Sequence, residues 1–195
     1  METADDVMDE SRLDKLVRRA GDRDDRAFGE LYDEFAQRVY AYVRGRLSDP
    51  VEAEDVTAEV FLKAWEALPR YDARGLPFSA WLFRIARNAV VDAYRRDMRR
   101  PTTTDADEAE AQAGPHAVEA EVLDSIDAAE LRRYVARLTG AQAEVVALRF
   151  FAGFSPGETA RITGRTEGAV KAMQHRAIAT LARMLGSESG DDRTQ

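Results

Sequence analysis

The chain has 195 residues, of which 45% are hydrophobic and 33% are charged, and its formal net charge is −8. This composition is typical of a packed globular protein and excludes a chain that is disordered throughout. Because there is no cysteine and the two histidines, His116 and His175, are far apart, disulfides and thiolate metal sites are excluded, and we expect neither a metal nor another cofactor.

The first residues do not form a basic segment followed by an apolar run, which is the pattern of a secretory leader. Apolar runs of the roughly 18 residues needed to cross a membrane do not occur either. We therefore expect a cytoplasmic protein without membrane insertion.

The negative charge is concentrated in one segment. Residues 101–130 contain nine Asp or Glu residues and no Lys or Arg, so the rest of the chain carries a formal charge of only +1. The segment begins at Pro101 and contains few large apolar residues, and is therefore predicted to be a flexible linker. We predict five parts: an N-terminal extension (1–24), a first domain (25–100), an acidic linker (101–124), a second domain (125–186) and a disordered tail (187–195).

Apolar residues in both domains recur at spacings of three and four, which predicts an all-α fold. In the extension, Leu13, Leu16 and Val17 have the spacing of a short amphipathic helix. A stripe of apolar residues within 28–43, Tyr32 included, is predicted to be core. Asp49 followed by Pro50 indicates a helix start.

The helix that begins at Pro50 is expected to continue to about residue 68. A third helix is predicted from about residue 77 to residue 98, with a basic polar face opposite its apolar stripe. This face holds Arg84, Arg87, Asn88 and Arg95. The aromatic residues Tyr71, Trp81, Phe83 and Tyr94 lie near it in sequence. Basic residues beside aromatic rings suit single-stranded nucleic acid, whereas aromatic residues at helical spacing are also typical of a core, and composition leaves both readings open.

The second domain is predicted to begin with helices near residues 125–138 and 141–151. Ser155-Pro156-Gly157-Glu158 then has the pattern of a capping box with proline at the first helical position. Gly164 suits a left-handed turn and Thr166 suits the cap of a longer helix that reaches about residue 185. A short helix, a glycine turn and a second helix predict a helix-turn-helix.

In a helix-turn-helix the start of the second helix enters the major groove of DNA. That segment holds Lys171, Gln174, His175 and Arg176, with Arg165 just before it. We predict that Arg165 meets phosphate and that His175 contacts a base or phosphate. Glycine-linked helical hairpins are common, so this segment alone does not decide between a DNA reader and a structural hairpin.

Three stretches resemble one family. Residues 54–65, EDVTAEVFLKAW, resemble the polymerase-binding helix of region two of bacterial RNA polymerase sigma factors. Residues 77–92, PFSAWLFRIARNAVVD, are similar to the helix that melts the promoter and reads its minus-10 element, and residues 153–185 resemble the helix-turn-helix of region four that reads the minus-35 element. Because no third domain intervenes, the resemblance is to the extracytoplasmic-function group.

The resemblance implies three sets of contacts. A polymerase surface on the clamp helices of the large subunit is implied for Asp55, Glu59, Phe61, Leu62 and Trp65. Capture of a flipped minus-10 base and contact with its strand are implied for Tyr71, Arg74, Arg84, Arg87, Asn88 and Arg95. Duplex minus-35 contacts are implied for Arg165, Lys171, Ala172, Gln174, His175 and Arg176, where Ala172 and His175 depart from the residues that the family leads us to expect.

The resemblance also implies an anti-sigma protein as a partner, and no catalytic activity. A helix-turn-helix regulator that acts without polymerase is the main alternative, and the acidic 55–65 helix distinguishes the two, because such a regulator would more naturally show an apolar dimer seam. A hydrolase would need clustered carboxylates for metal, or a nucleophile beside a base, and the sequence has neither outside the linker. The linker is equally consistent with a nucleic-acid mimic and with a solvated tether.

Overall fold

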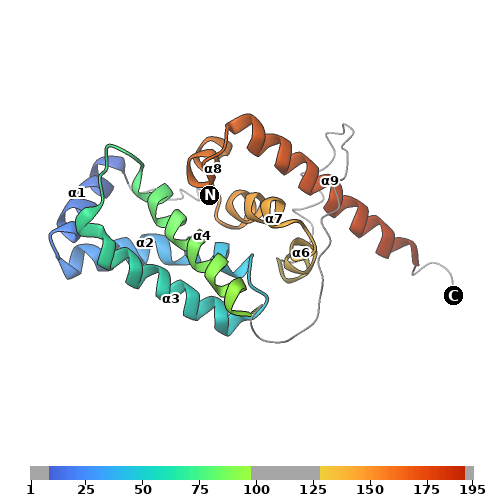
Figure 1. The fold of residues 1–195 in the computed structure, drawn as a ribbon, viewed down its shortest axis with the longest axis horizontal. Coiled ribbons are helices and arrows are strands. Elements are labelled where there is room, and N and C mark those ends of the chain that lie inside the picture. Colours follow the sequence, from blue (N-terminus) through green and yellow to red (C-terminus); the bar gives the residue numbers. More distant parts are fainter. Residues whose placement is uncertain (1–8, 98–127, 192–195) are drawn as a thin grey trace, which may run out of the picture.

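The computed structural model describes residues 9–97 and 128–191, and all regular structure within these two segments is helical. Figure 1 shows one bundle formed by the N-terminal helices and a second helical unit beside α4. The helices of the first segment are α1 (Glu10–Gly21), α2 (Asp25–Arg44), α3 (Pro50–Ala67), the 3-10 turn η1 (Leu68–Arg70) and α4 (Phe78–Asp97). The second segment contains α6 (Ala128–Val135), α7 (Gly140–Val146), the π-helical turn η2 (Ala147–Phe151), α8 (Pro156–Thr163) and α9 (Glu167–Asp191).

The all-α prediction is therefore confirmed, and most predicted helix starts coincide with observed caps. The Asp49 carboxylate accepts a hydrogen bond from the Val51 N–H at 2.9 Å, with Pro50 in the first turn. Asp24 caps α2 in the same way, accepting from the N–H groups of Arg26 and Ala27. Such caps satisfy amide groups that have no partner within the helix.

The N-terminal extension contains an ordered helix that belongs to the first bundle. Leu16 and Val17 of α1 are buried, Leu13 is partly buried against the same core, and α1 packs on α2 and η1. The short amphipathic helix that these residues suggest is confirmed. The extension and the first domain therefore share one core over the described residues.

The predicted helix-turn-helix is present in α8 and α9. Ser155 and Glu158 form a capping box, in which the Glu158 N–H donates to Ser155 and the Ser155 N–H donates to the Glu158 carboxylate at 2.8 Å. Gly164 ends α8 with φ of 70°, and the Thr166 hydroxyl accepts from the Ala169 N–H at the start of α9. The turn chemistry of the sequence thus specifies this motif.

The helix expected at residues 141–151 changes geometry after Val146. The Ala152 N–H donates to the carbonyl of Ala147, five residues earlier, so the last turn is wider than an α-helix. This turn directs Leu148, Ala152 and Phe154 into the core of the first bundle, where they are buried. Ile162 of α8 belongs to the same core, which the two units therefore share.

Among the described residues, none of the helices is both long enough and apolar enough to cross a membrane. The predicted linker and the residues near 125–127 lie outside the part of the chain that the structure describes, so the expectations for them are not addressed by it.

We expect Gly164→Ala to lower the free energy of unfolding by about 1 kcal/mol, because a side chain at positive φ clashes with the backbone. Gly168→Ala is the control: Gly168 lies in the first turn of α9, nothing lies within 4 Å of an added Cβ, and alanine there should stabilise by about 0.5 kcal/mol. Urea unfolding followed by circular dichroism measures both. Equal effects would contradict the left-handed turn as the cause.

Candidate nucleic-acid and protein interfaces

One face of α3 is exposed and combines acidic with apolar residues. Asp55 is exposed and Leu62 retains 59% of its accessible surface, while Trp65 is half-buried beside Phe28. Phe61, predicted as a contact residue, is only 5% exposed. Phe61 lies on the core-facing side of α3, where its ring packs against those of Phe28 and Tyr32.

A residue that the sequence reading assigned to the core extends this face. Tyr32 of α2 is 45% exposed, and its ring lies 4.6 Å from that of Phe61. Tyr32 was misassigned because its spacing matches the apolar stripe of α2, whereas the position lies at the edge of that stripe. We call Tyr32, Asp55, Leu62 and Trp65 the α3 face.

Glu59 connects the α3 face to the end of α4. Its carboxylate lies 2.6 Å from the Lys63 ammonium and 3.3 Å from the Arg96 guanidinium. The hydrogen bond from Lys63, together with that from Arg96, holds the pKa of the Glu59 carboxyl below its ordinary value of 4.5. Arg23, whose φ is 66°, donates to the Trp65 carbonyl at 3.0 Å and so ties the start of the bundle to the end of α3.

The loop before α4 is held in shape by aromatic packing. Tyr71 donates from its hydroxyl to the Leu76 carbonyl at 2.6 Å, and its ring lies 4.9 Å from that of Trp81 and 6.0 Å from that of Phe78. Burial raises the pKa of the Tyr71 hydroxyl, which therefore remains a donor at neutral pH. Arg74 is exposed at the tip and pairs with Asp72 at 3.1 Å.

The basic residues of α4 have different surroundings. Asn88 and Arg95 are exposed, and Arg95 lies 3.5 Å from Asp92. Arg84 donates to the backbone carbonyl of Arg161 at 2.8 Å, and Arg87 pairs with Glu144 of α7. Arg84 and Arg87, which are predicted to contact the DNA strand, therefore bind the second domain in this structure.

Phe83 is buried and is not available to a base. It is 0% exposed and packs edge-on against Tyr42 and Phe154, because α4 is covered on two sides. The suggestion that it stands near the nucleic-acid face is therefore corrected: Phe83 is a core residue. Trp81 is half-buried in the cluster with Tyr71, and Tyr94 is 37% exposed.

Helix α9, the second helix of the helix-turn-helix, presents a row of exposed residues at its start. Lys171, Ala172 and Arg176 are exposed, and Lys171 lies 2.7 Å from Glu167. His175 is half-buried. Gln174 is partly buried and its side-chain oxygen accepts from Arg149 at 2.9 Å, so it is positioned by η2.

Arg165 lies in the turn before α9 and is 28% exposed, and it pairs with Glu144 at 3.0 Å. The Glu144 side chain is 6% exposed and is held by Arg87 as well. The sequence carried no signal for Glu144, because its partners lie 57 and 21 residues away and it occurs in a helix that otherwise suggests a core.

Comparison with known proteins identifies both halves of this architecture. Residues 31–100 match the family model of sigma-70 region 2, and residues 128–181 match that of sigma-70 region 4. The class is thus that of sigma-70-type transcription factors, with one region in each helical unit.

Individual relatives narrow the class. The chain is 40% identical over 181 residues to the ECF RNA polymerase sigma factor BldN of Streptomyces coelicolor, covering 93% of this chain and 69% of BldN. It is 37% identical over 182 residues to the ECF RNA polymerase sigma factor SigD of Mycobacterium tuberculosis, covering 90% and 84% of the two chains. The solved structure of CnrH in complex with the cytosolic domain of CnrY matches with a TM-score of 0.68 and 27% identity, covering 92% of this chain and 99% of CnrH. The chain belongs to the extracytoplasmic-function (ECF) family of RNA polymerase sigma factors.

The lowered pKa of the Glu59 carboxyl predicts that the stability of the fold decreases at acidic pH. A carboxylate whose pKa is lower in the folded state stabilises the fold above its ordinary pKa, and this contribution disappears as the pH falls through the lower, folded value. We expect wild type to be more stable than Glu59→Gln at pH 7, with the difference unchanged down to about pH 5 and shrinking below 4.5. Urea unfolding across this range measures the difference.

Glu54→Gln is the matched control, because Glu54 is exposed on the same helix and its substitution removes the same charge. A gap for Glu59→Gln that widens on acidification would contradict the ion pairs with Lys63 and Arg96.

Proposed function

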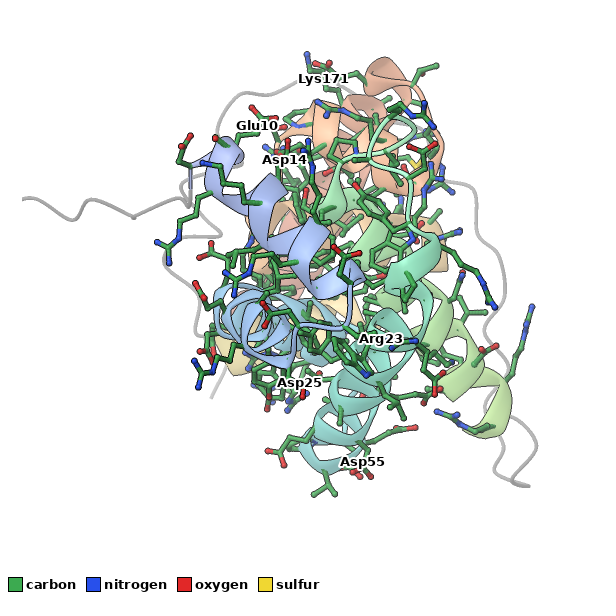
Figure 2. All side chains as sticks on the ribbon, turned by 90° about the vertical axis from the view of Figure 1, so that its left-hand side faces the viewer. Glu10, Asp14, Arg23, Asp25, Asp55 and Lys171 are labelled. Carbon is green, nitrogen blue, oxygen red and sulfur yellow. The ribbon has the colours of Figure 1, made fainter. Side chains whose placement is uncertain are left out.

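We propose that this sigma factor binds core RNA polymerase through the α3 face and directs initiation by reading the minus-10 element with α4 and its preceding loop, and the minus-35 element with α9. The observation that carries the proposal is the presence of both sigma regions in one chain, each with exposed residues at the expected contact positions. In Figure 2 the labelled Asp55 and Lys171 lie at opposite ends of the molecule, so polymerase and minus-35 DNA approach different surfaces.

Polymerase docking is supported by the chemistry of the α3 face. Leu62 is the large apolar side chain with 59% exposure there, and Asp55 supplies negative charge beside it. An exposed apolar residue bordered by charge is typical of a protein interface. The ion pair between Glu59 and Arg96 places this interface next to the end of α4, so docking also orients the DNA-reading helix.

Reading of the minus-10 element requires a base outside the stack, which costs a few kcal/mol. The loop held by Tyr71, Trp81 and Leu76 borders the start of α4, and Asn88 is exposed farther along that helix. An amide recognises a base through paired hydrogen bonds, and guanidinium groups bind the phosphates. Arg74 and Arg95 are exposed for that second role.

Minus-35 recognition is assigned to the start of α9. Lys171, Ala172 and Arg176 are exposed there, and Arg149 fixes the orientation of Gln174. The short Ala172 side chain permits close approach to a thymine methyl group, and Lys171 and Arg176 suit guanine or phosphate. His175, half-buried on the next turn, remains a predicted contact.

An anti-sigma protein is proposed as the regulator, since CnrH was solved in complex with the cytosolic domain of CnrY. The functional boundaries are proposed as region two at 25–100, region four at 125–186 and a tether between them. The action is binding and positioning of polymerase at cytoplasmic promoter DNA, without catalysis by this chain; the relatives are transcription factors of that kind.

We expect Leu62→Asp to weaken binding to core polymerase by about ten-fold, because a charge replaces an apolar contact at the centre of the α3 face. Phe150→Asp is the control: Phe150 is an exposed apolar residue (36%) of η2, in the other helical unit and away from the α3 face. Titration of core polymerase with fluorescently labelled protein measures both. Equal losses for the two variants would point to a general charge effect and refute the assignment.

We expect Asn88→Ala to reduce initiation at defined start sites by about ten-fold while polymerase affinity stays unchanged, since Asn88 is exposed and lies outside the α3 face. Transcription from a panel of random promoters, with core polymerase alone and with added protein, measures the effect. Undiminished initiation would remove Asn88 from the base-reading site. If wild type adds no initiation and binds duplex DNA alone with sequence preference, the independent regulator is the correct function.

A further inference from the structure

The end of α2 and helix α6 bring four arginines together around one small cavity. Its volume is about 90 Å³, and it is lined by Arg44 and Arg46 of the first helical unit and by Arg132 and Arg133 of the second. Arg133 and Ala136 are exposed at its edge, so the cavity opens to solvent. A guanidinium group keeps its positive charge at any physiological pH, so four positive charges converge on this volume.

These four charges are not neutralised by carboxylates. Within residues 9–97 and 128–191, no Asp or Glu oxygen lies within 4.0 Å of any of the four guanidinium groups. The arginines that we propose as DNA contacts, by contrast, mostly lie beside carboxylates. The Nε–H groups of Arg46 and Arg132 are also buried and donate no hydrogen bond in this part of the chain. Unsatisfied buried donors and repulsion between cations are both unfavourable, and a bound anion relieves both.

Arg46 is held in place by both helical units. It donates to the Gly140 carbonyl of α7 at 3.3 Å, and its guanidinium carbon lies 5.6 Å from the centre of the Tyr94 ring of α4. The Tyr94 hydroxyl in turn donates to the Arg46 carbonyl. The side chain is therefore ordered before a ligand binds, which lowers the entropic cost of binding.

The neighbouring arginines are positioned in similar ways. The Arg132 guanidinium lies over the Phe151 ring at 5.8 Å, and Arg44 donates to the Leu47 carbonyl at 2.8 Å. Arg133 is exposed and makes no ion pair with the described residues. Three ordered guanidinium groups thus line the cavity, and a fourth borders its opening.

The size and charge of the cavity define the ligand that suits it. A water molecule occupies about 30 Å³, so a cavity of about 90 Å³ accommodates one phosphoryl group but not a base or a sugar. A terminal phosphate carries close to two negative charges and has three oxygens that accept strong hydrogen bonds from guanidinium groups. A phosphodiester of a nucleic-acid backbone carries one charge and has only two free oxygens, so it satisfies fewer of these donors.

We propose that Arg44, Arg46, Arg132 and Arg133 form a binding site for the terminal phosphate of a small anion, such as pyrophosphate or a nucleoside diphosphate. Because the arginines come from both helical units, the bound anion stabilises the arrangement in which α2 and α6 are adjacent. None of the four is among the promoter contacts assigned above, so this inference is independent of the proposed function.

The test is calorimetric titration of the full chain with pyrophosphate, in magnesium-free buffer at constant ionic strength. We expect one pyrophosphate to bind per chain, and Arg132→Gln and Arg133→Gln each to weaken binding by about ten-fold, since each removes a charge-assisted hydrogen bond. Arg70→Gln is the control and should bind as wild type, because Arg70 is exposed on η1 and does not line the cavity.

Circular dichroism establishes that each variant is folded. If Arg132→Gln proves unfolded, Arg133→Gln decides alone, because the Arg133 side chain is exposed and holds no described residue in place. Absence of saturable binding to wild type overturns the site. Equal affinities of wild type and folded Arg133→Gln overturn it as well.

Competition against pyrophosphate identifies the source of the phosphate. Displacement by ADP assigns the site to a nucleotide, and pyrophosphate binding that ADP does not displace assigns it to the free anion; both support the proposal. A single-stranded oligonucleotide without terminal phosphates is the third probe. If it displaces pyrophosphate at an equal concentration of phosphate groups, a phosphodiester suffices and the site belongs to a nucleic-acid backbone, which overturns the proposal.

Discussion

The structure depends on the burial of α4 on two sides. Leu82 and Ala89 are 0% exposed, as expected for a helix that closes a bundle, but Phe83, Ala86 and Val90 are equally buried. The second set is covered partly by η2 and α8, which makes one apolar core continuous between the two sigma regions. A small helical bundle has limited surface to bury, so this shared core contributes to the stability of both units.

The π-helical turn η2 allows residues of the second unit to reach the core of the first bundle. A regular α-helix through residue 151 would continue the direction of α7, whereas the wider turn brings Leu148 and Phe154 toward α2 and α4. Arg149 then donates to the Phe154 carbonyl and to Gln174, so the segment that contacts the first domain also orients the recognition helix. One segment, η2, therefore takes part both in the contact between the two units and in positioning a side chain of α9.

Local chemistry was the part of this fold that could be predicted. Asp49, Ser155, Gly164 and Thr166 specify caps and a turn through neighbours within four residues, and each is found in that role. The long-range contacts could not be predicted in this way. Nothing near Glu144 indicates Arg87, and the spacing of Tyr32 and Phe83 in their helices does not reveal that a neighbouring domain buries one ring and leaves the other exposed. Periodicity gives the apolar stripe of a helix but not how many partners cover it.

Most of the arginines that we propose as DNA contacts have carboxylate partners in this structure. A guanidinium group without a carboxylate partner attracts any polyanion, and this applies to the arginines that we propose as phosphate contacts. Glu144 removes Arg87 and Arg165 from this pool and Asp72 and Asp92 lie beside Arg74 and Arg95, so several of the proposed contacts already have carboxylate partners. A DNA phosphate that binds one of these arginines has to displace its carboxylate partner. Exchange of the exposed pairs costs little, because water screens them, while exchange at Glu144 would leave a buried carboxylate without its cation and so costs more. The burial of Glu144 thus separates its arginine partners from the arginines whose carboxylate partners are exposed.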